Sequence, residues 1–186
     1  MLSKTVSAGK VLIVGGGVTG MQAALDLADS GYYVYLVEKT GAIGGAMAQL
    51  DKTFPTNDCS MCILAPKMVE CGRHANIEIL TLSDVTDISG TAGNFQATIT
   101  EHPRYIDTER CIACGICTEK CPKSVDSTYD ALTGKRKAVY VKYAQAVPLK
   151  YQIDPQSCIR LNKPGKCGIC EEVCVADAIR FDDTEK

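Results

Sequence analysis

Cys111-Ile-Ala-Cys114-Gly-Ile-Cys117-Thr-Glu-Lys-Cys121-Pro122 is the stretch that decides the fold of the second half of this chain. Its four cysteines are separated by gaps of two, two and three residues, and proline follows the last one. At this spacing three thiolates bind one 4Fe-4S cubane while the fourth thiolate reaches a different cluster. A second incomplete set of cysteines is therefore expected further along the chain.

That second set is present, with a gap of eight residues followed by the same gaps of two and three. Its members are Cys158, Cys167, Cys170 and Cys174. The crossing rule exchanges the last cysteine of each run, so that each cluster receives three ligands from one run and one from the other. The first predicted ligand set is Cys111, Cys114, Cys117 and Cys174. The second predicted ligand set is Cys158, Cys167, Cys170 and Cys121.

Zinc and disulfides are the alternatives for these cysteines. Paired Cys-x-x-Cys motifs also bind zinc, but three cysteines within seven residues and a Cys-Pro pair favour a cubane. The chain starts Met-Leu-Ser-Lys without an apolar leader, which predicts a cytoplasmic, reducing location where thiols stay free for metal. The sequence thus predicts two 4Fe-4S clusters.

Composition adds few constraints on function. The 186 residues are 46% hydrophobic and 23% charged, as in an ordinary globular protein of one or two domains. A net charge of -2 lacks the basic surface that nucleic acid requires, so we expect no nucleic-acid partner. No apolar run reaches the roughly 18 residues that a spanning helix needs, so we expect no transmembrane segment.

The first half of the chain begins with a strand, a glycine turn and a helix. Residues 11–14 are apolar and mostly β-branched, residues 15–20 read Gly-Gly-Gly-Val-Thr-Gly, and apolar residues recur at helical spacing across 21–28. Residues 33–37 predict the next parallel strand, and Glu38 follows it directly. This βαβ context makes the G-x-G-x-x-G turn a specific dinucleotide-binding fingerprint, with a purely structural glycine turn as the alternative.

Each residue of the fingerprint has a physical role. Gly15 permits the tight turn, Gly17 lets the backbone approach a pyrophosphate, and Gly20 lets the helix pack on the strand. The phosphates then lie at the helix N-terminus. Glu38 stands eighteen residues after Gly20, where an acid is expected to bind the ribose hydroxyls.

A second glycine turn, Gly41-Ala-Ile-Gly44-Gly45, follows at once. It resembles the corresponding turn of the flavoproteins with two dinucleotide-binding domains, the glutathione and thioredoxin reductase class. The resemblance implies FAD as the dinucleotide. The predicted FAD-binding residues are Gly15, Gly16, Gly17, Gly20, Glu38, Lys39 and Gly45.

The segment Phe54-Pro-Thr-Asn-Asp-Cys59-Ser-Met-Cys62-Ile-Leu-Ala-Pro-Lys67 comes next. Together with the glycine turns and the cysteine runs, in this order from Val11 to Phe181, it resembles the heterodisulfide reductase A family. The resemblance implies an oxidoreductase subunit that is active only in a complex. It implies electron transfer between FAD and the clusters, with flavin-based bifurcation or confurcation. The implied partners are heterodisulfide reductase B- and C-like subunits, hydrogenase- or dehydrogenase-like electron donors, and ferredoxin.

Cys59 and Cys62 have three possible roles. They bind a further iron–sulfur cluster, with Cys71 and a ligand from elsewhere; they form a redox-active disulfide; or they are ordinary thiols. Lys67 is a candidate to lie near the isoalloxazine, where a cation stabilises reduced flavin, and the alternative is a surface lysine.

The predicted fold has two parts. Residues 1–103 form an α/β Rossmann-like FAD-binding half-domain of the thioredoxin/glutathione reductase type, with a β-meander over residues 77–100. Residues 104–186 form an α+β bacterial-type ferredoxin module with two 4Fe-4S clusters. The half-domain leaves an open sheet edge, so a second chain or a continuation is expected to supply the remaining half of the FAD domain. The rival hypothesis is a ferredoxin-like carrier or adaptor that binds no flavin.

Overall fold

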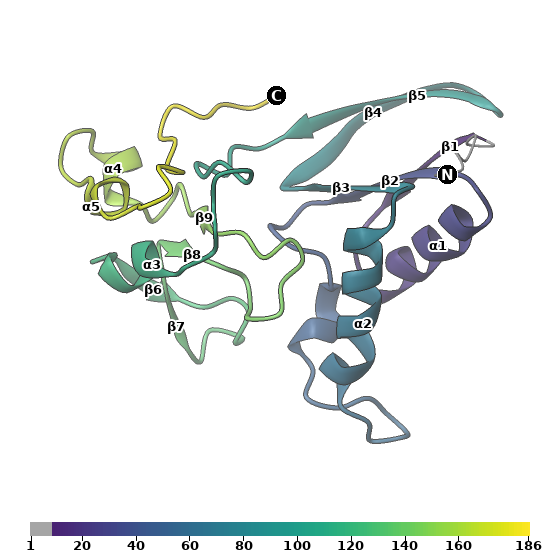
Figure 1. The fold of residues 1–186 in the computed structure, drawn as a ribbon, viewed down its shortest axis with the longest axis horizontal. Coiled ribbons are helices and arrows are strands. Elements are labelled where there is room, and N and C mark those ends of the chain that lie inside the picture. Colours follow the sequence, from purple (N-terminus) through teal and green to yellow (C-terminus); the bar gives the residue numbers. More distant parts are fainter. Residues whose placement is uncertain (1–8) are drawn as a thin grey trace, which may run out of the picture. The chain divides into compact units, whose positions relative to one another are not determined.

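The structure, a computed structural model, describes residues 9–186, so the first eight residues of the predicted FAD domain lie outside the described part. The chain divides into two compact units (Figure 1). One reaches to His102 and includes Lys186, and the other runs from Pro103 to Glu185. Within the described part, no helix is both long enough and apolar enough to span a bilayer.

A three-stranded parallel sheet forms the centre of the first unit. Its strands, in sheet order, are β1 (Lys10–Val14), β2 (Tyr33–Glu38) and β3 (Ile77–Thr81). The connecting elements are α1 (Val18–Asp29), the 3-10 helix η1 (Gly45–Gln49) and α2 (Ser60–Arg73). The helices α1 and α2 lie together on one face of the sheet (Figure 1). Met21 of α1 and Leu64 of α2 are among their buried residues and have no exposed surface.

Strand β1 is one edge of this sheet among the described residues, and β3 is the other. It pairs in parallel with β2 only, and Val14 at its end is 63% exposed. By contrast, Val34 and Leu36 of the central strand β2 are fully buried. Parallel sheets are normally covered on both faces, and an apolar edge strand presents unpaired backbone groups to which a further strand can pair.

The predicted β-meander over residues 77–100 is wrong for its first strand, β3, which belongs to the parallel sheet instead. β3 pairs in parallel with β2, from Val34 opposite Ile77 to Glu38 opposite Thr81, because the crossover through α2 brings it back in the same direction. Of the strands in this region, β4 (Ser83–Thr91) and β5 (Asn94–Glu101) form an antiparallel hairpin, whose turn contains Gly93 at φ 85°.

The second unit is built from short elements around the cysteines. The helices are α3 (Ile116–Lys120), α4 (Ile159–Asn162) and α5 (Ile169–Glu172). The hairpins are β6 (Ser124–Asp126) with β7 (Lys135–Lys137), and β8 (Val139–Tyr140) with β9 (Gln152–Ile153). Its small core contains Ile106, Val139, Ile153 and Ile179 together with the buried cysteines. Such a small core has little apolar area, so metal ligation is the expected source of further stability.

Candidate functional site

The first glycine turn connects β1 to the N-terminus of α1 through backbone that only glycine can occupy at two points. Gly15 has φ +105° and donates its N–H to the Val37 carbonyl at 2.7 Å. A Cβ on Gly20 would lie 1.9 Å from the Gly15 carbonyl oxygen. A Cβ on Gly17 would meet nothing within 4 Å, because Gly17 is the N-cap of α1 and faces open space. This opening at a helix N-terminus fits a pyrophosphate.

The second glycine turn packs directly on the first. Gly44 donates its N–H to the Gly16 carbonyl at 2.7 Å, and Gly45 has φ +59°. A Cβ on Gly45 would approach the Gly17 Cα to 2.9 Å, and a Cβ on Gly16 would approach Ile43 Cγ2 to 2.6 Å. The structure therefore brings all five predicted glycines together at the carboxyl ends of β1 and β2, where open α/β sheets bind their ligands.

Glu38 closes this site from the end of β2. Its carboxylate is buried and accepts hydrogen bonds from Gly16 N–H at 2.9 Å, Thr40 N–H at 2.9 Å and the Thr40 hydroxyl at 2.8 Å. An ionised carboxylate has about four acceptor positions, so it can still accept a ribose hydroxyl. Lys39 lies beside it and is exposed. Open space at Gly17 next to an anchored carboxylate matches the pyrophosphate and ribose of FAD, so these residues fit the cofactor.

We expect Glu38→Ala to weaken flavin binding by about 2 kcal/mol, or about 30-fold in Kd, because a charged hydrogen-bond partner is lost. Flavin retained by the complete native subunit through anaerobic gel filtration measures this loss. Glu78→Ala is the matched control, because Glu78 is an exposed acid on the neighbouring strand β3. Equal flavin retention in the Glu38 and Glu78 variants would contradict the ribose role.

The eight cysteines of the second unit line two separate hollows of similar size, with about 350 and 320 Å³ of atom-free space. The cysteines of the first hollow are Cys111, Cys114, Cys117 and Cys174. The cysteines of the second hollow are Cys121, Cys158, Cys167 and Cys170. Among the described residues no three acidic, histidine or cysteine side chains converge closely enough to hold a single metal ion. The grouping is the one that the crossing rule predicts.

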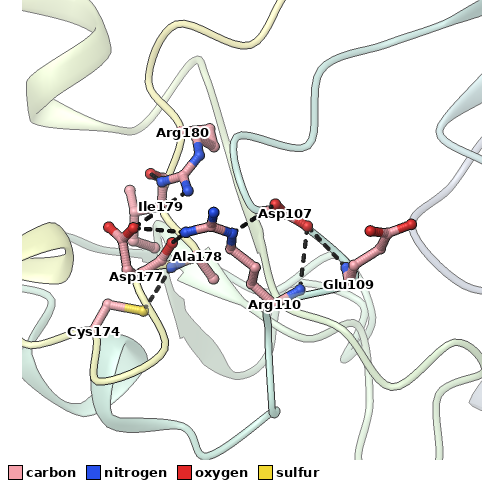
Figure 2. Close-up of polar contacts among 8 residues, drawn as sticks. All are labelled: Asp107, Glu109, Arg110, Cys174, Asp177, Ala178, Ile179 and Arg180. Atoms are coloured by element: carbon pink, nitrogen blue, oxygen red, sulfur yellow. Dashed lines mark hydrogen bonds and ion pairs between the residues drawn. The ribbon is translucent and has the colours of Figure 1, made fainter.

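A brace between distant segments brings Cys174 to the first run (Figure 2). Ile106 and Ile179 form an antiparallel bridge, and Asp107 N–H donates to the Ala178 carbonyl at 2.8 Å. Arg110, which precedes Cys111, binds the Asp177 carboxylate at 2.8 Å. These contacts join the residues just before Cys111 to those just after Cys174, and so hold Cys174 beside the first run.

Each cysteine run is preceded by the same short motif, which the sequence analysis missed. Ile-Asp occurs before both Cys111 and Cys158, with the aspartate four positions ahead of the cysteine. In each case the cysteine N–H donates to the aspartate carbonyl at 2.9 Å: Cys111 to Asp107, and Cys158 to Asp154. Each aspartate carboxylate also accepts a backbone N–H two residues on. The Ile-Asp-x-x-x-Cys pattern therefore occurs twice, and this repeat is the sequence signal that the two cysteine runs are similar units.

Burial makes two of these thiols, Cys117 and Cys170, poor acids. Desolvation raises the pKa of Cys117 to about 11 and that of Cys170 to about 12. Thiolates bind iron, so cluster insertion must expel these protons and is favoured at higher pH. Two cations lie near the first set: the buried Arg104, and Lys150, whose Nζ donates to the Cys111 carbonyl at 2.6 Å.

Helix α2 carries the remaining candidate residues. Cys59 is its N-cap, Cys62 lies in its first turn, and both are exposed. Cys71 is fully buried at the other end of the helix, with its thiol directed at the Met21 carbonyl at 3.6 Å. The structure therefore does not bring Cys71 to the other two. Lys67 contacts the Gln22 side chain of α1 through its Nζ.

Family models match both units. The FAD dependent oxidoreductase model covers residues 10–60, which include both glycine turns and Glu38. The 4Fe-4S binding domain model covers residues 104–125, which include the first cysteine run. These matches confirm the predicted fold class and its cofactor types, FAD and iron–sulfur clusters.

Named relatives match along most of the chain. The iron-sulfur A-type subunit of CoB–CoM heterodisulfide reductase from Methanocaldococcus jannaschii is 54% identical, over 92% of this chain and 25% of that protein. The chain is a homologue of the heterodisulfide reductase A proteins. The corresponding subunit of a heterodisulfide, ferredoxin reductase from Methanothermobacter marburgensis is 52% identical, over 93% of this chain and 25% of that protein. An iron-sulfur A-type subunit of CoB–CoM heterodisulfide reductase from Methanopyrus kandleri is 58% identical, over 77% of this chain and 22% of that protein.

The heterodisulfide reductase A relatives are much longer than this sequence. The chain spans about a quarter of their length.

Proposed function

We propose that this chain is the FAD- and iron–sulfur-binding part of an electron-transfer subunit in a heterodisulfide-reductase-like complex. The proposal rests on one observation: a flavin glycine site and two hollows of four cysteines occur in a single chain. Flavin supplies the exchange between two-electron and one-electron chemistry, and iron–sulfur clusters accept single electrons. The names of the relatives support a disulfide reductase that works with other redox subunits.

The residues of the first unit would bind and orient the flavin. Gly17 at the α1 N-terminus leaves room for the pyrophosphate, and the Glu38 carboxylate accepts from the ribose. Lys67 is our candidate for a cation near the flavin ring. Its ammonium already has a polar partner in Gln22, which would hold it in place for that role.

The residues of the second unit would hold two 4Fe-4S clusters. Arg104 and Lys150 place positive charge near the first set, and Lys123 and Arg160 line the hollow of the second set. Positive charge favours the reduced, more negative state of a cluster, so both clusters would serve as one-electron acceptors. The proposal includes flavin-based electron bifurcation, or its reverse, with these clusters as the one-electron carriers. Heterodisulfide reductase B- and C-like subunits, hydrogenase- or dehydrogenase-like donors and ferredoxin are the proposed partners.

The native complex, purified anaerobically, tests this proposal. We expect its visible spectrum to show flavin bands above broad iron–sulfur absorption, acid treatment to release FAD, and mass spectrometry to identify co-purifying redox subunits. Flavin should be lost when this chain carries Glu38→Ala. Iron–sulfur absorption without releasable flavin would instead support a ferredoxin-like carrier that binds no flavin.

A further inference from the structure

Two exposed cysteines meet at the start of α2, outside both cofactor sites. Cys59 Sγ and Cys62 Sγ are 2.7 Å apart, and the Cys62 N–H donates to Cys59 Sγ at 3.3 Å. Cys71 does not join them, because the helical rise places it about 14 Å further along the axis, and its side chain is buried. The pair therefore stands apart from Cys71, the other cysteine of the first unit.

The two thiols are not equivalent. Hydrogen bonds from the Cys62 thiol and backbone N–H lower the pKa of Cys59. Donating that bond raises the pKa of Cys62. Cys59 is also the N-cap of a 14-residue helix, whose N-terminus favours a thiolate. Cys59 is thus the better nucleophile, and Cys62 is the protonated thiol in contact with it.

A reactant can reach the pair from solvent. An open, mainly apolar hollow runs along the outer face of α2, from Cys62 past Ala65, Pro66 and Val69 towards Arg73. Val69, which lines this hollow, is 42% exposed. Cys62 lines this hollow, and Cys59 is exposed beside it, so a compact organic molecule along this face can bring a sulfur atom to the pair.

We propose that Cys59 and Cys62 form a two-electron dithiol–disulfide couple that exchanges with an organic disulfide. The arrangement supplies what such a couple needs: an exposed nucleophile, a resolving thiol in contact with it, and no further ligand from Cys71. The proposal does not depend on the flavin or on the clusters of the second unit, so it can fail while the proposed function stands.

The exchange balances without another reagent. The Cys59 thiolate attacks one sulfur of the organic disulfide, its S–S bond breaks, and the leaving half departs as a thiolate that takes up the proton lost by Cys59. Cys62 then loses its proton and attacks Cys59 Sγ, which breaks the mixed disulfide and releases the second half as a thiol. The protein pair is oxidised by two electrons, and the organic disulfide is reduced to two thiols.

Trypsin provides a direct assay for the couple. Cleavage after Lys52 and Lys67 gives one peptide, residues 53–67, that contains Cys59 and Cys62 and no other cysteine. The full chain, prepared anaerobically, is equilibrated in glutathione buffers of increasing oxidised fraction, quenched with iodoacetamide and digested. We expect this peptide to pass from doubly alkylated to unalkylated and two hydrogens lighter in one step, and dithiothreitol to reverse the change.

Two variants test the order of attack by the two thiols, and a third variant is the control. Cys62→Ser should trap one glutathione on Cys59, because the resolving thiol is absent, while Cys59→Ser should trap at least tenfold less at neutral pH. Cys71→Ser should leave the titration of the 53–67 peptide unchanged, because the buried Cys71 falls in the following peptide. All three positions lie outside the proposed flavin-binding residues and cluster ligands.

Two results would overturn the proposal. The first is a peptide whose cysteines are alkylated independently at every glutathione ratio, which describes ordinary thiols. The second is a peptide that resists alkylation until iron is chelated, with the same treatment releasing more than about eight iron atoms per chain, which describes ligands of a further cluster.

Discussion

Replacing Cys114 with serine is expected to remove about four of about eight iron atoms from this chain, because each cubane contains four irons and the two ligand sets are separate. Cys114 is the exposed member of the first set, so the substitution removes a ligand without opening the core. Iron and acid-labile sulfide, measured on anaerobically reconstituted chain, give the result. Cys71→Ser is the matched control, since its buried hydroxyl can still donate to the Met21 carbonyl.

Two outcomes would contradict this expectation. Unchanged iron in the Cys114 variant would mean that Cys114 is no ligand. Loss of all iron would mean that the two hollows do not fill independently. Electron paramagnetic resonance of the reduced variant should show the signal of one isolated cluster, without the broadening that a neighbouring paramagnetic cluster causes.

Gly20→Ala is expected to abolish flavin binding and to destabilise the first unit by about 3 kcal/mol, the upper end of the cost of overpacking. The new Cβ would lie 1.9 Å from the Gly15 carbonyl oxygen, and this obstacle is backbone rather than a flexible side chain. The glycine turn must therefore move away from α1. Flavin per chain and the thermal unfolding midpoint of the complete subunit measure the two effects.

Gly17→Ala separates flavin binding from folding at the same turn. Its Cβ would meet no protein atom within 4 Å, and its φ of -75° suits alanine. We expect an unchanged unfolding midpoint with at least tenfold weaker flavin binding, because the methyl group occupies the space of the pyrophosphate. Full flavin retention in this variant would contradict the location of the phosphate site.

The sequence predicted the parts of the fold that are governed by local periodicity. The strand, glycine turn and helix from Val11 to Ala28 were expected because apolar runs and helical spacing are properties of neighbouring residues. Helix α2 was not predicted: the sequence analysis assigned no secondary structure to this segment, although Leu64, Met68 and Cys71 recur at helical spacing and Pro66 lies inside the helix.

Pairing over long distances was harder to predict. The alternation in β3 is the same for a meander and for a parallel sheet, and only the crossover through α2 decides between them. The grouping of Cys174 with Cys111 came from the known behaviour of the motif. Its physical basis, the bridge between Ile106 and Ile179, joins residues 73 positions apart and is invisible to local patterns.

The iron content of two double variants tests most directly whether each cysteine run completes the cluster of the other. If Cys114 and Cys174 bind the same cluster, the double serine variant retains about four iron atoms. If Cys170 and Cys174 bind different clusters, the double serine variant of Cys170 and Cys174 retains almost no iron. Uncrossed ligation predicts the reverse order, so about four iron atoms in the Cys170 and Cys174 variant and almost none in the Cys114 and Cys174 variant would contradict crossed ligation.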